Sequence, residues 1–225
     1  MSLILNIDTS GTAASVSVAN NGELLGLKEN EAQSEHASFL QPAIGQLFGE
    51  LHMEMSSLDA VAVVNGPGSY TGLRVGLASA KGICYALNKP LISIGTLPLM
   101  AKAALQQLPV ADAASLFLCP MIDARRQEVF TAMYDAELKI IWPAQAHILS
   151  DDSFVADLLQ NRILFFGNGA AKFQVMTQSS NAMFAGVYSH SKALALFSYE
   201  KFELNDFTTL AYSEPLYLKE FYSGQ

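Results

Sequence analysis

Hydrophobic and polar positions in the first half of the chain switch between the period of a strand and the period of a helix. An apolar run ends at Asp8, and residues of the two kinds then alternate up to Asn21-Gly22, a dipeptide typical of a tight hairpin turn. From Phe39 to Leu51 the apolar residues recur three and four positions apart, as on one face of a helix. The elements predicted for this half are strands at 2–8, 12–19, 23–28, 60–65 and 91–94, with helices at 39–51 and 71–87.

The same succession of patterns starts again in the second half. An apolar run ends at Asp123 as the first run ends at Asp8, and the two aspartates lie 115 residues apart. The simplest interpretation is an α/β protein with two lobes of similar topology, each with a sheet covered by helices. We expect the lobes at 1–105 and 106–225. The elements predicted for the second half are strands at 116–122, 128–134, 138–142 and 163–166, with helices at 152–160 and around 189–201.

Composition places the chain among globular proteins. Of its 225 residues 51% are hydrophobic and 15% are charged, which excludes a disordered chain. The sequence starts without a basic segment, and no apolar run reaches the length of about 18 residues that spans a bilayer, so we expect neither a signal peptide nor a membrane helix. Cys84 and Cys119 lie in apolar runs and indicate reduced, buried thiols, which favours a cytoplasmic location.

The net charge of −8 is concentrated near the N-terminus. Residues 1–60 carry eight acidic side chains and one basic one, so almost the whole net charge lies there. A protein that binds nucleic acid by itself usually has a basic stripe that neutralises phosphates. The one pair of adjacent bases is Arg125-Arg126. We therefore expect no strong nucleic-acid binding by this chain alone.

Two segments are candidates for a phosphate site. Gly66, Gly68 and Ser69 form a Gly-Pro-Gly-Ser turn between a predicted strand and a predicted helix, where backbone amides often bind an anion; a tight structural turn is the alternative. Asp8-Thr9-Ser10, after the first strand, is similar to the phosphate loop of actin-like ATPases. The corresponding segment that starts at Asp123 has no glycine, so we do not expect unaided ATP hydrolysis.

Metal and nucleophile chemistry have little support in the sequence. The four histidines have no spacing suited to zinc, and no His-Glu-x-x-His motif occurs. We expect each histidine at the surface or at a helix end, and Asp151-Asp152 at the start of a helix. No Ser/His/Asp arrangement supports a peptidase.

The helix predicted at 71–87 has small residues at four-residue spacing, namely Gly72, Gly76 and Ala80. Glycine inside a helix costs about 0.5–1 kcal/mol relative to alanine, so two glycines on one face need an explanation. They allow another helix to approach closely. That helix belongs to the same lobe or to another subunit. The pattern leaves both interpretations open, and they are compatible because a helix can use opposite faces.

Several motifs together resemble a known family. The chain is similar to the TsaB (YeaZ) family, the non-catalytic partners of TsaD in bacterial synthesis of threonylcarbamoyladenosine in tRNA. The motifs that carry this resemblance are Ile7-Asp8-Thr9-Ser10, Glu35-His36 with Leu40-Gln41-Pro42-Ala43-Ile44, Gly66-Pro67-Gly68-Ser69-Tyr70-Thr71-Gly72-Leu73-Arg74-Val75-Gly76 with Lys81-Gly82, Ile122-Asp123-Ala124-Arg125-Arg126-Gln127-Glu128-Val129-Phe130 and Glu214-Pro215-Leu216-Tyr217-Leu218.

The resemblance implies an actin-like (ASKHA, ribonuclease-H-like) fold with two βββαβα-type lobes and mixed sheets. It also implies a scaffold that supports threonylcarbamoyl transfer to the adenosine beside the anticodon of tRNAs reading codons that begin with A. TsaD-like proteins hold a metal with two histidines where this chain has Thr96 and Met100, so the resemblance implies no catalysis and no metal here. The alternative function is an actin-like kinase or ATPase that uses the Asp8 loop.

The resemblance further implies that the two helices of the first lobe bind a TsaD-like subunit, and a second copy when the chain is alone. A TsaE-like ATPase and tRNA would be reached through the complex. We expect no cofactor, while ATP or ADP at a subunit boundary stays open. Glu29, Glu31, Glu35, Glu50 and Glu54 are predicted to rim the interface. The residues assigned to it are Phe39, Leu40, Ile44, Leu47, Leu51, Gly72, Leu73, Gly76 and Ala80.

Overall fold

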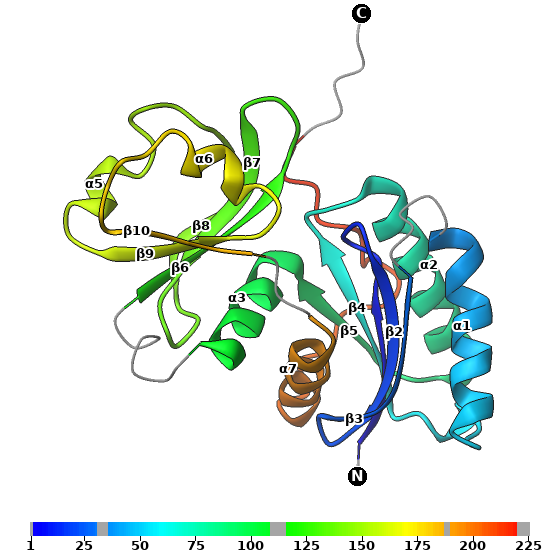
Figure 1. The fold of residues 1–225 in the computed structure, drawn as a ribbon. Helices are drawn as coiled ribbons and strands as arrows, with labels where there is room; N and C mark the ends of the chain where they lie inside the picture. Colours follow the sequence, from blue (N-terminus) through cyan, green and yellow to red (C-terminus); the bar gives the residue numbers. More distant parts are fainter. Residues whose placement is uncertain (1, 31–35, 109–115, 187–189, 220–225) are drawn as a thin grey trace, which may run out of the picture. The chain divides into compact units, whose positions relative to one another are not determined.

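The structure is a computed structural model, and it describes residues 2–30, 36–108, 116–186 and 190–219. Two compact units divide the chain. The first contains Met1–Leu99 and His190–Leu216, and the second contains Met100–Ser189 and Tyr217–Gln225. Each unit is built around one five-stranded sheet (Figure 1).

The first sheet has the strand order β3-β2-β1-β4-β5. Its central strand β1 runs antiparallel to β2 and parallel to β4, so the sheet is mixed. Asn21 and Gly22 both have positive φ in the turn between β2 and β3, which confirms the predicted hairpin. The strands are β1 (Leu3–Asp8), β2 (Ala14–Asn20), β3 (Glu23–Asn30), β4 (Ala60–Gly66) and β5 (Leu91–Gly95).

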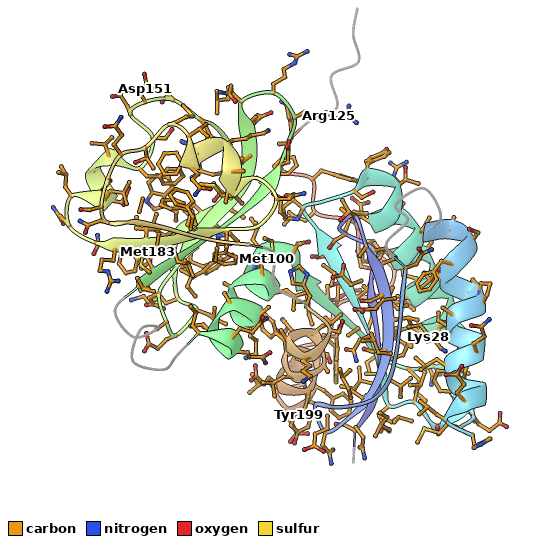
Figure 2. The ribbon with its side chains drawn as sticks, viewed as in Figure 1. Lys28, Met100, Arg125, Asp151, Met183 and Tyr199 are labelled. Carbon is orange, nitrogen blue, oxygen red and sulfur yellow. The ribbon has the colours of Figure 1, made fainter. Side chains whose placement is uncertain are left out.

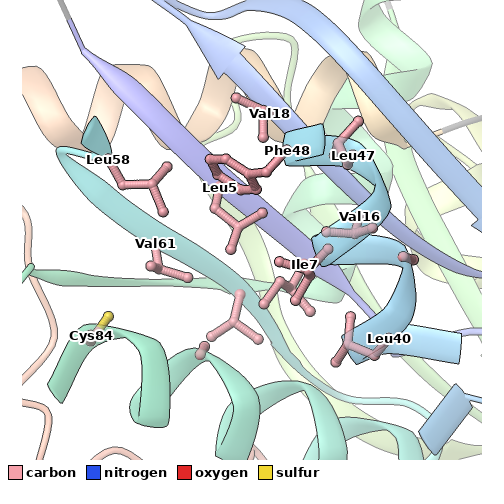
Figure 3. Packing of buried hydrophobic residues seen from close by; sticks show 14 of the residues in the cluster. Leu5, Ile7, Val16, Val18, Leu40, Leu47, Phe48, Leu58, Val61 and Cys84 are labelled. Atoms are coloured by element: carbon pink, nitrogen blue, oxygen red, sulfur yellow. The ribbon is translucent and has the colours of Figure 1, made fainter. Parts of the chain in front are cut away.

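Helices cover both faces of this sheet. Figure 1 shows α1 (His36–Glu50) and α2 (Tyr70–Leu87) on one side and α7 (Ser191–Glu203) on the other. Because strand side chains alternate between faces, β1 directs Leu5 and Ile7 toward α1 and α2. There they pack with apolar side chains of both helices in one buried cluster (Figure 3).

The second sheet repeats the first in its connections. Its order is β10-β9-β6-β7-β8. Its central strand β6 runs antiparallel to β7 and parallel to β9, as β1 runs antiparallel to β2 and parallel to β4. β1 to β5 thus correspond to β6 to β10, which confirms two lobes of similar topology. The strands are β6 (Leu116–Asp123), β7 (Glu128–Tyr134), β8 (Ile140–Ile148), β9 (Arg162–Phe166) and β10 (Ala182–Ala185).

The helices of the second unit are short. α5 (Val155–Leu158) and α6 (Ala170–Gln174) lie over a cluster of buried aromatic rings in which Phe154, Phe165 and Phe173 have centroids 4.8–5.2 Å apart. These rings fill the core of the second unit, whereas side chains of longer helices fill the core of the first unit.

The sequence did not predict α3 (Thr96–Gln107), α6 or β10. α6 and β10 are short, and α3 starts directly after Gly95, the last residue of β5, so no loop separates these two elements. The boundary predicted between 105 and 106 also differs from the compact units. The helix predicted at 189–201, observed as α7, contacts β1, β2, β3 and β5, because it covers the open face of the first sheet.

Candidate functional site

The carboxylate of Asp8, at the end of β1, is buried and fully engaged by neighbours in the first unit. Its Oδ1 accepts hydrogen bonds from the Ser10 amide at 2.9 Å and the Ser10 hydroxyl at 2.6 Å. Its Oδ2 lies 3.5 Å from Nδ1 of His190, at the start of α7. Burial alone would raise the pKa of Asp8, but the contacts with His190 and Ser10 outweigh it and lower the pKa. His190 lies at a helix end, as expected, but nothing in the sequence indicates its contact with Asp8.

The two predicted phosphate segments pack directly against each other. The Ser69 amide donates to the Ser10 carbonyl at 2.7 Å, and a Cβ on Gly68 would lie 2.2 Å from the same oxygen. Thr9 is buried and donates its hydroxyl to the Gly72 carbonyl at 2.7 Å. The glycine at 68 is therefore required by the close approach of two backbones.

The start of α2 is capped by its own residues. The Ser69 hydroxyl accepts from the Gly72 amide at 3.3 Å, as an N-cap does. The Ser69 amide is used by Ser10, and Gly66 lies against the Leu216 carbonyl, which is 2.7 Å from where its Cβ would be. The structure thus brings the candidate nucleotide residues together, but their contacts favour the tight structural turn. A role in nucleotide binding stays a prediction.

The second unit contains a matching arrangement at the end of β6. Oδ1 of Asp123 accepts from Lys172 Nζ at 2.7 Å and from the Arg125 amide at 2.6 Å. The hydrogen bond from Lys172 is the largest cause that lowers the pKa of Asp123. Asn168 Oδ1 accepts from the Asp123 amide at 2.9 Å. A glycine-containing turn therefore packs against the end of the central strand region in both units, against Ser10 in the first and against Asp123 in the second.

Thr96 and Met100, one turn apart on α3, are both buried. The Thr96 hydroxyl oxygen has no partner among the described residues. Met100, labelled in Figure 2, places its terminal methyl group 2.5 Å from the position that a Cβ on Gly167 would take. A hydroxyl and a thioether are a poor ligand set for a hard or borderline metal ion, and Met100 acts here as packing. In the described ranges no three His, Cys, Asp or Glu side chains are grouped so that they could hold a metal ion.

Most residues predicted to bind a partner pack inside the first unit, and their role in partner binding stays a prediction. Phe39 and Leu51 are partly buried and pack against the same core. Gly76 is buried, and a Cβ at this position would lie 2.3 Å from the Thr9 hydroxyl oxygen. The small residues of α2 thus accommodate β1 and its loop, the packing alternative that the sequence left open. The seven fully buried residues of this set are Leu40, Ile44, Leu47, Gly72, Leu73, Gly76 and Ala80.

The outer faces of α1 and α2 present a different set of residues. Gln41 and Ser79 join the two helices through a side-chain hydrogen bond of 2.9 Å. Gly45 and Gly82 have no atom within 4 Å of a built Cβ, and Tyr85 is 83% exposed. We call these residues the outer helix face; its exposed or partly exposed members are Gln41, Pro42, Gly45, Gly49, Ala78, Ser79, Gly82 and Tyr85.

The acidic side chains expected around the interface lie in different places. Glu50 pairs with Lys28 at 2.6 Å, beside α1 (Figure 2). Glu29 accepts from the Ser191 hydroxyl at 2.9 Å and so belongs to the α7 side. Glu54 is exposed after α1. Glu31 and Glu35 lie outside the described residues, and among the other three acidic side chains Glu50 and Glu54 lie on the α1 side.

A comparison with protein-family models identifies the class of protein to which this arrangement belongs. The model described as TsaD: tRNA N6-adenosine threonylcarbamoyltransferase matches residues 18–196, and the chain therefore belongs to this family. Among the described residues, no helix is both long enough and apolar enough to span a membrane.

Within the family the chain resembles proteins named tRNA threonylcarbamoyladenosine biosynthesis protein TsaB, as its motifs predicted. The Haemophilus influenzae protein is 34% identical over 56% of this chain, and the Escherichia coli protein is 32% identical over 62%. The match spans 51% and 58%, respectively, of those two relatives' own length. The Bacillus subtilis protein is 25% identical over 78% of this chain and 75% of its own.

Solved structures confirm the fold. A Pseudomonas aeruginosa protein described as similar to peptidase YEAZ has a TM-score of 0.82 at 25% identity, with 97% of this chain and 100% of that chain covered. A second structure, YeaZ from Pseudomonas aeruginosa, has a TM-score of 0.79 at 24% identity with the same coverage. The expected α/β fold with two mixed sheets is thereby confirmed.

Proposed function

We propose that this chain is a non-catalytic subunit that binds a TsaD-like protein and supports threonylcarbamoyl transfer to tRNA. The observation that carries the proposal is the outer helix face, a surface on two adjacent helices in which glycine, alanine and serine predominate. The buried Thr96 and Met100 support the non-catalytic part, because they stand where TsaD-like proteins have metal-binding histidines. The names of the TsaB relatives support the pathway.

The outer helix face has the features of a helix-packing surface. Gly45 and Gly82 leave both backbones without covering side chains, so a partner helix can approach closely there. Tyr85 stands next to this opening with its ring exposed, and exposed tyrosines often anchor interfaces. The Lys28–Glu50 pair lies at the margin, where charged groups guide association more than they strengthen it.

The test uses glycines that have open space around them. Gly45→Arg and Gly82→Arg place a long side chain on the outer helix face, and each should improve helix propensity, so neither should unfold the chain. Gly186→Arg is the matched control, because Gly186 is also exposed and open but lies in the second unit. Each variant is co-purified with the TsaD-like subunit and scored for modified tRNA in a reconstituted reaction.

We expect both helix variants to lose the complex and the modification activity, while Gly186→Arg keeps them. Melting curves of the isolated variants check that folding is preserved. A full complex with Gly45→Arg and Gly82→Arg present together would overturn the proposed surface. A second copy of the chain would use the same face when the partner is absent, and a TsaE-like ATPase would join through the complex in the cytoplasm.

The alternative function, an actin-like ATPase based on the Asp8 loop, has less support. Asp8 is occupied by Ser10 and His190, and the Ser69 amide is occupied by the Ser10 carbonyl. Titration calorimetry of the isolated chain with ATP and magnesium separates the two functions. Tight binding, with turnover that disappears in Asp8→Ala, would favour the alternative.

A further inference from the structure

Arg125 and Arg126 form an exposed turn between β6 and β7 with an unusual backbone. Both residues are in the left-handed region, with φ of 68° and 49°. Asparagine and glycine adopt two successive left-handed positions readily, whereas arginine does so at a cost. Figure 2 shows Arg125 at this turn. Two successive arginines are therefore unfavourable in this turn conformation. This local cost indicates that the arginine side chains have a function.

The acidic groups around this turn are already neutralised. Asp123 pairs with Lys172 at 2.7 Å, and Glu128 pairs with Lys219 at 2.5 Å. Neither Arg125 nor Arg126 has an ion pair within the described ranges. The two guanidinium groups therefore give the turn a local charge of about +2 on a chain whose net charge is −8.

We propose that the Arg125–Arg126 turn contacts phosphate groups of the RNA backbone in the assembled complex. This inference rests on the proposed function, which supplies tRNA as the ligand, and it assigns a tRNA-contacting site to this chain. A guanidinium group binds phosphate oxygens through two parallel hydrogen bonds, and its charge does not titrate.

Phosphate fits this site better than an acidic protein surface. Each neutralised phosphate releases condensed counterions, so even two contacts strengthen RNA binding measurably. Almost the whole net charge of −8 lies in residues 1–60, and the sequence has no broad basic face, so a local contact at an exposed turn suits this chain. A TsaD-like subunit would supply the remaining affinity.

The test replaces the turn by the residues that its backbone prefers. Arg125→Asn combined with Arg126→Gly removes both charges and should stabilise the hairpin, so loss of folding does not explain its effect. The matched control is Lys139→Gln combined with Lys192→Gln, which removes two charges from exposed lysines that have no ion pair among the described residues. Binding of a tRNA transcript to the purified complex with the TsaD-like subunit is measured by fluorescence anisotropy at several salt concentrations.

We expect the turn variant to assemble normally and to bind tRNA about tenfold more weakly, with a slope of log K against log salt that is smaller by about 1.5 for two lost contacts. The lysine control should change binding much less. Unchanged tRNA affinity, or equal losses in both variants, would overturn the inference. Loss of assembly with the TsaD-like subunit would assign the turn to a protein contact and would also overturn it.

The failure of the proposed function gives a different result. In that case the wild-type chain itself does not assemble with the TsaD-like subunit. The same titration is then made with the isolated chain at low salt, where weaker tRNA binding by the turn variant than by the lysine control supports the arginine contact, and equal binding overturns it.

Discussion

Nδ1 of His190 lies 3.5 Å from Oδ2 of Asp8, although one residue lies near the N-terminus of the sequence and the other in its last fifth. The contact joins the end of the first strand to the start of the last helix. The other ring nitrogen of His190, Nε2, has no hydrogen-bond partner among the described residues. The position of α7 on the first sheet therefore depends partly on one polar contact.

Replacement of Asp8 by asparagine should lower stability in a pH-dependent way. The folded-state pKa of Asp8 is lower than its ordinary value of 3.8, so its charge stabilises the fold above that pH and the effect is lost as the pH falls through the folded-state value. At pH 7 we expect Asp8→Asn to cost about 2 kcal/mol, as for a charged hydrogen bond. Urea unfolding from pH 7 to pH 3 should show this difference shrinking only below about pH 4.

The exposed Asp151, labelled in Figure 2, provides the control for this series. Asp151→Asn should change the free energy of unfolding by less than about 0.5 kcal/mol across the same pH range. A difference for Asp8→Asn that stayed constant down to pH 3 would contradict the assigned role of its charge.

Alanine at two glycines of α2 should have opposite effects. Gly82 has open space, so Gly82→Ala should stabilise the protein by about 0.5–1 kcal/mol through helix propensity. A Cβ at Gly76 would lie 2.3 Å from the Thr9 hydroxyl oxygen, so Gly76→Ala should destabilise it by about 2 kcal/mol. Thermal melting should show one increase and one decrease in Tm. A stabilising Gly76→Ala would show that the contact with β1 is not as close as described.

Two buried threonines should respond differently to valine. The Thr96 hydroxyl is unpartnered, so Thr96→Val removes a buried polar group and should be neutral or stabilising. Thr9→Val loses the 2.7 Å hydrogen bond to the Gly72 carbonyl and should cost about 1–2 kcal/mol. Chemical denaturation of both variants checks this order. Because Thr96 is not assigned to catalysis, Thr96→Val should also keep full activity in a reconstituted tRNA-modification reaction.

Both thiols should react slowly in the folded protein. Burial raises the pKa of Cys84 to about 11 and that of Cys119 to about 12, so little thiolate is present at pH 8. We expect slow labelling by a disulfide reagent under native conditions, with Cys119 the slower, and rapid labelling of both in denaturant. Fast native labelling of Cys119 would mean that the core of the second unit opens readily.

Periodicity predicted most of the architecture because long, amphipathic elements carry a clear signal. The hairpin at Asn21-Gly22 and the strand over 128–134 were predicted at their observed positions. The repeat of the aspartate at the end of each central strand also led correctly to two similar sheets. The five-residue helix α6 was missed because little more than one helical turn cannot show a repeated period.

The surface was harder to predict than the fold. The four-residue spacing of small residues indicated that α2 packs closely against another element. It did not indicate which face of α2 is buried and which is exposed. Gly76 and Gly82 look alike in sequence, whereas one lies against Thr9 and the other has no neighbour. Only the position of β1, which is distant in sequence, decides between them. The same reason hid the contact between Asp8 and His190.

The return of the chain to its first unit has a consequence for synthesis. β1 to β5 leave the ribosome early. The helix α7, which covers the open face of their sheet, and Leu216, whose amide donates to the Asn65 carbonyl, are synthesised near the end of translation. One face of the first sheet therefore stays uncovered, and accessible to chaperones, until the second unit and then α7 have been synthesised. A chain that ends near residue 189 should be captured by chaperones even though its N-terminal sequence is intact.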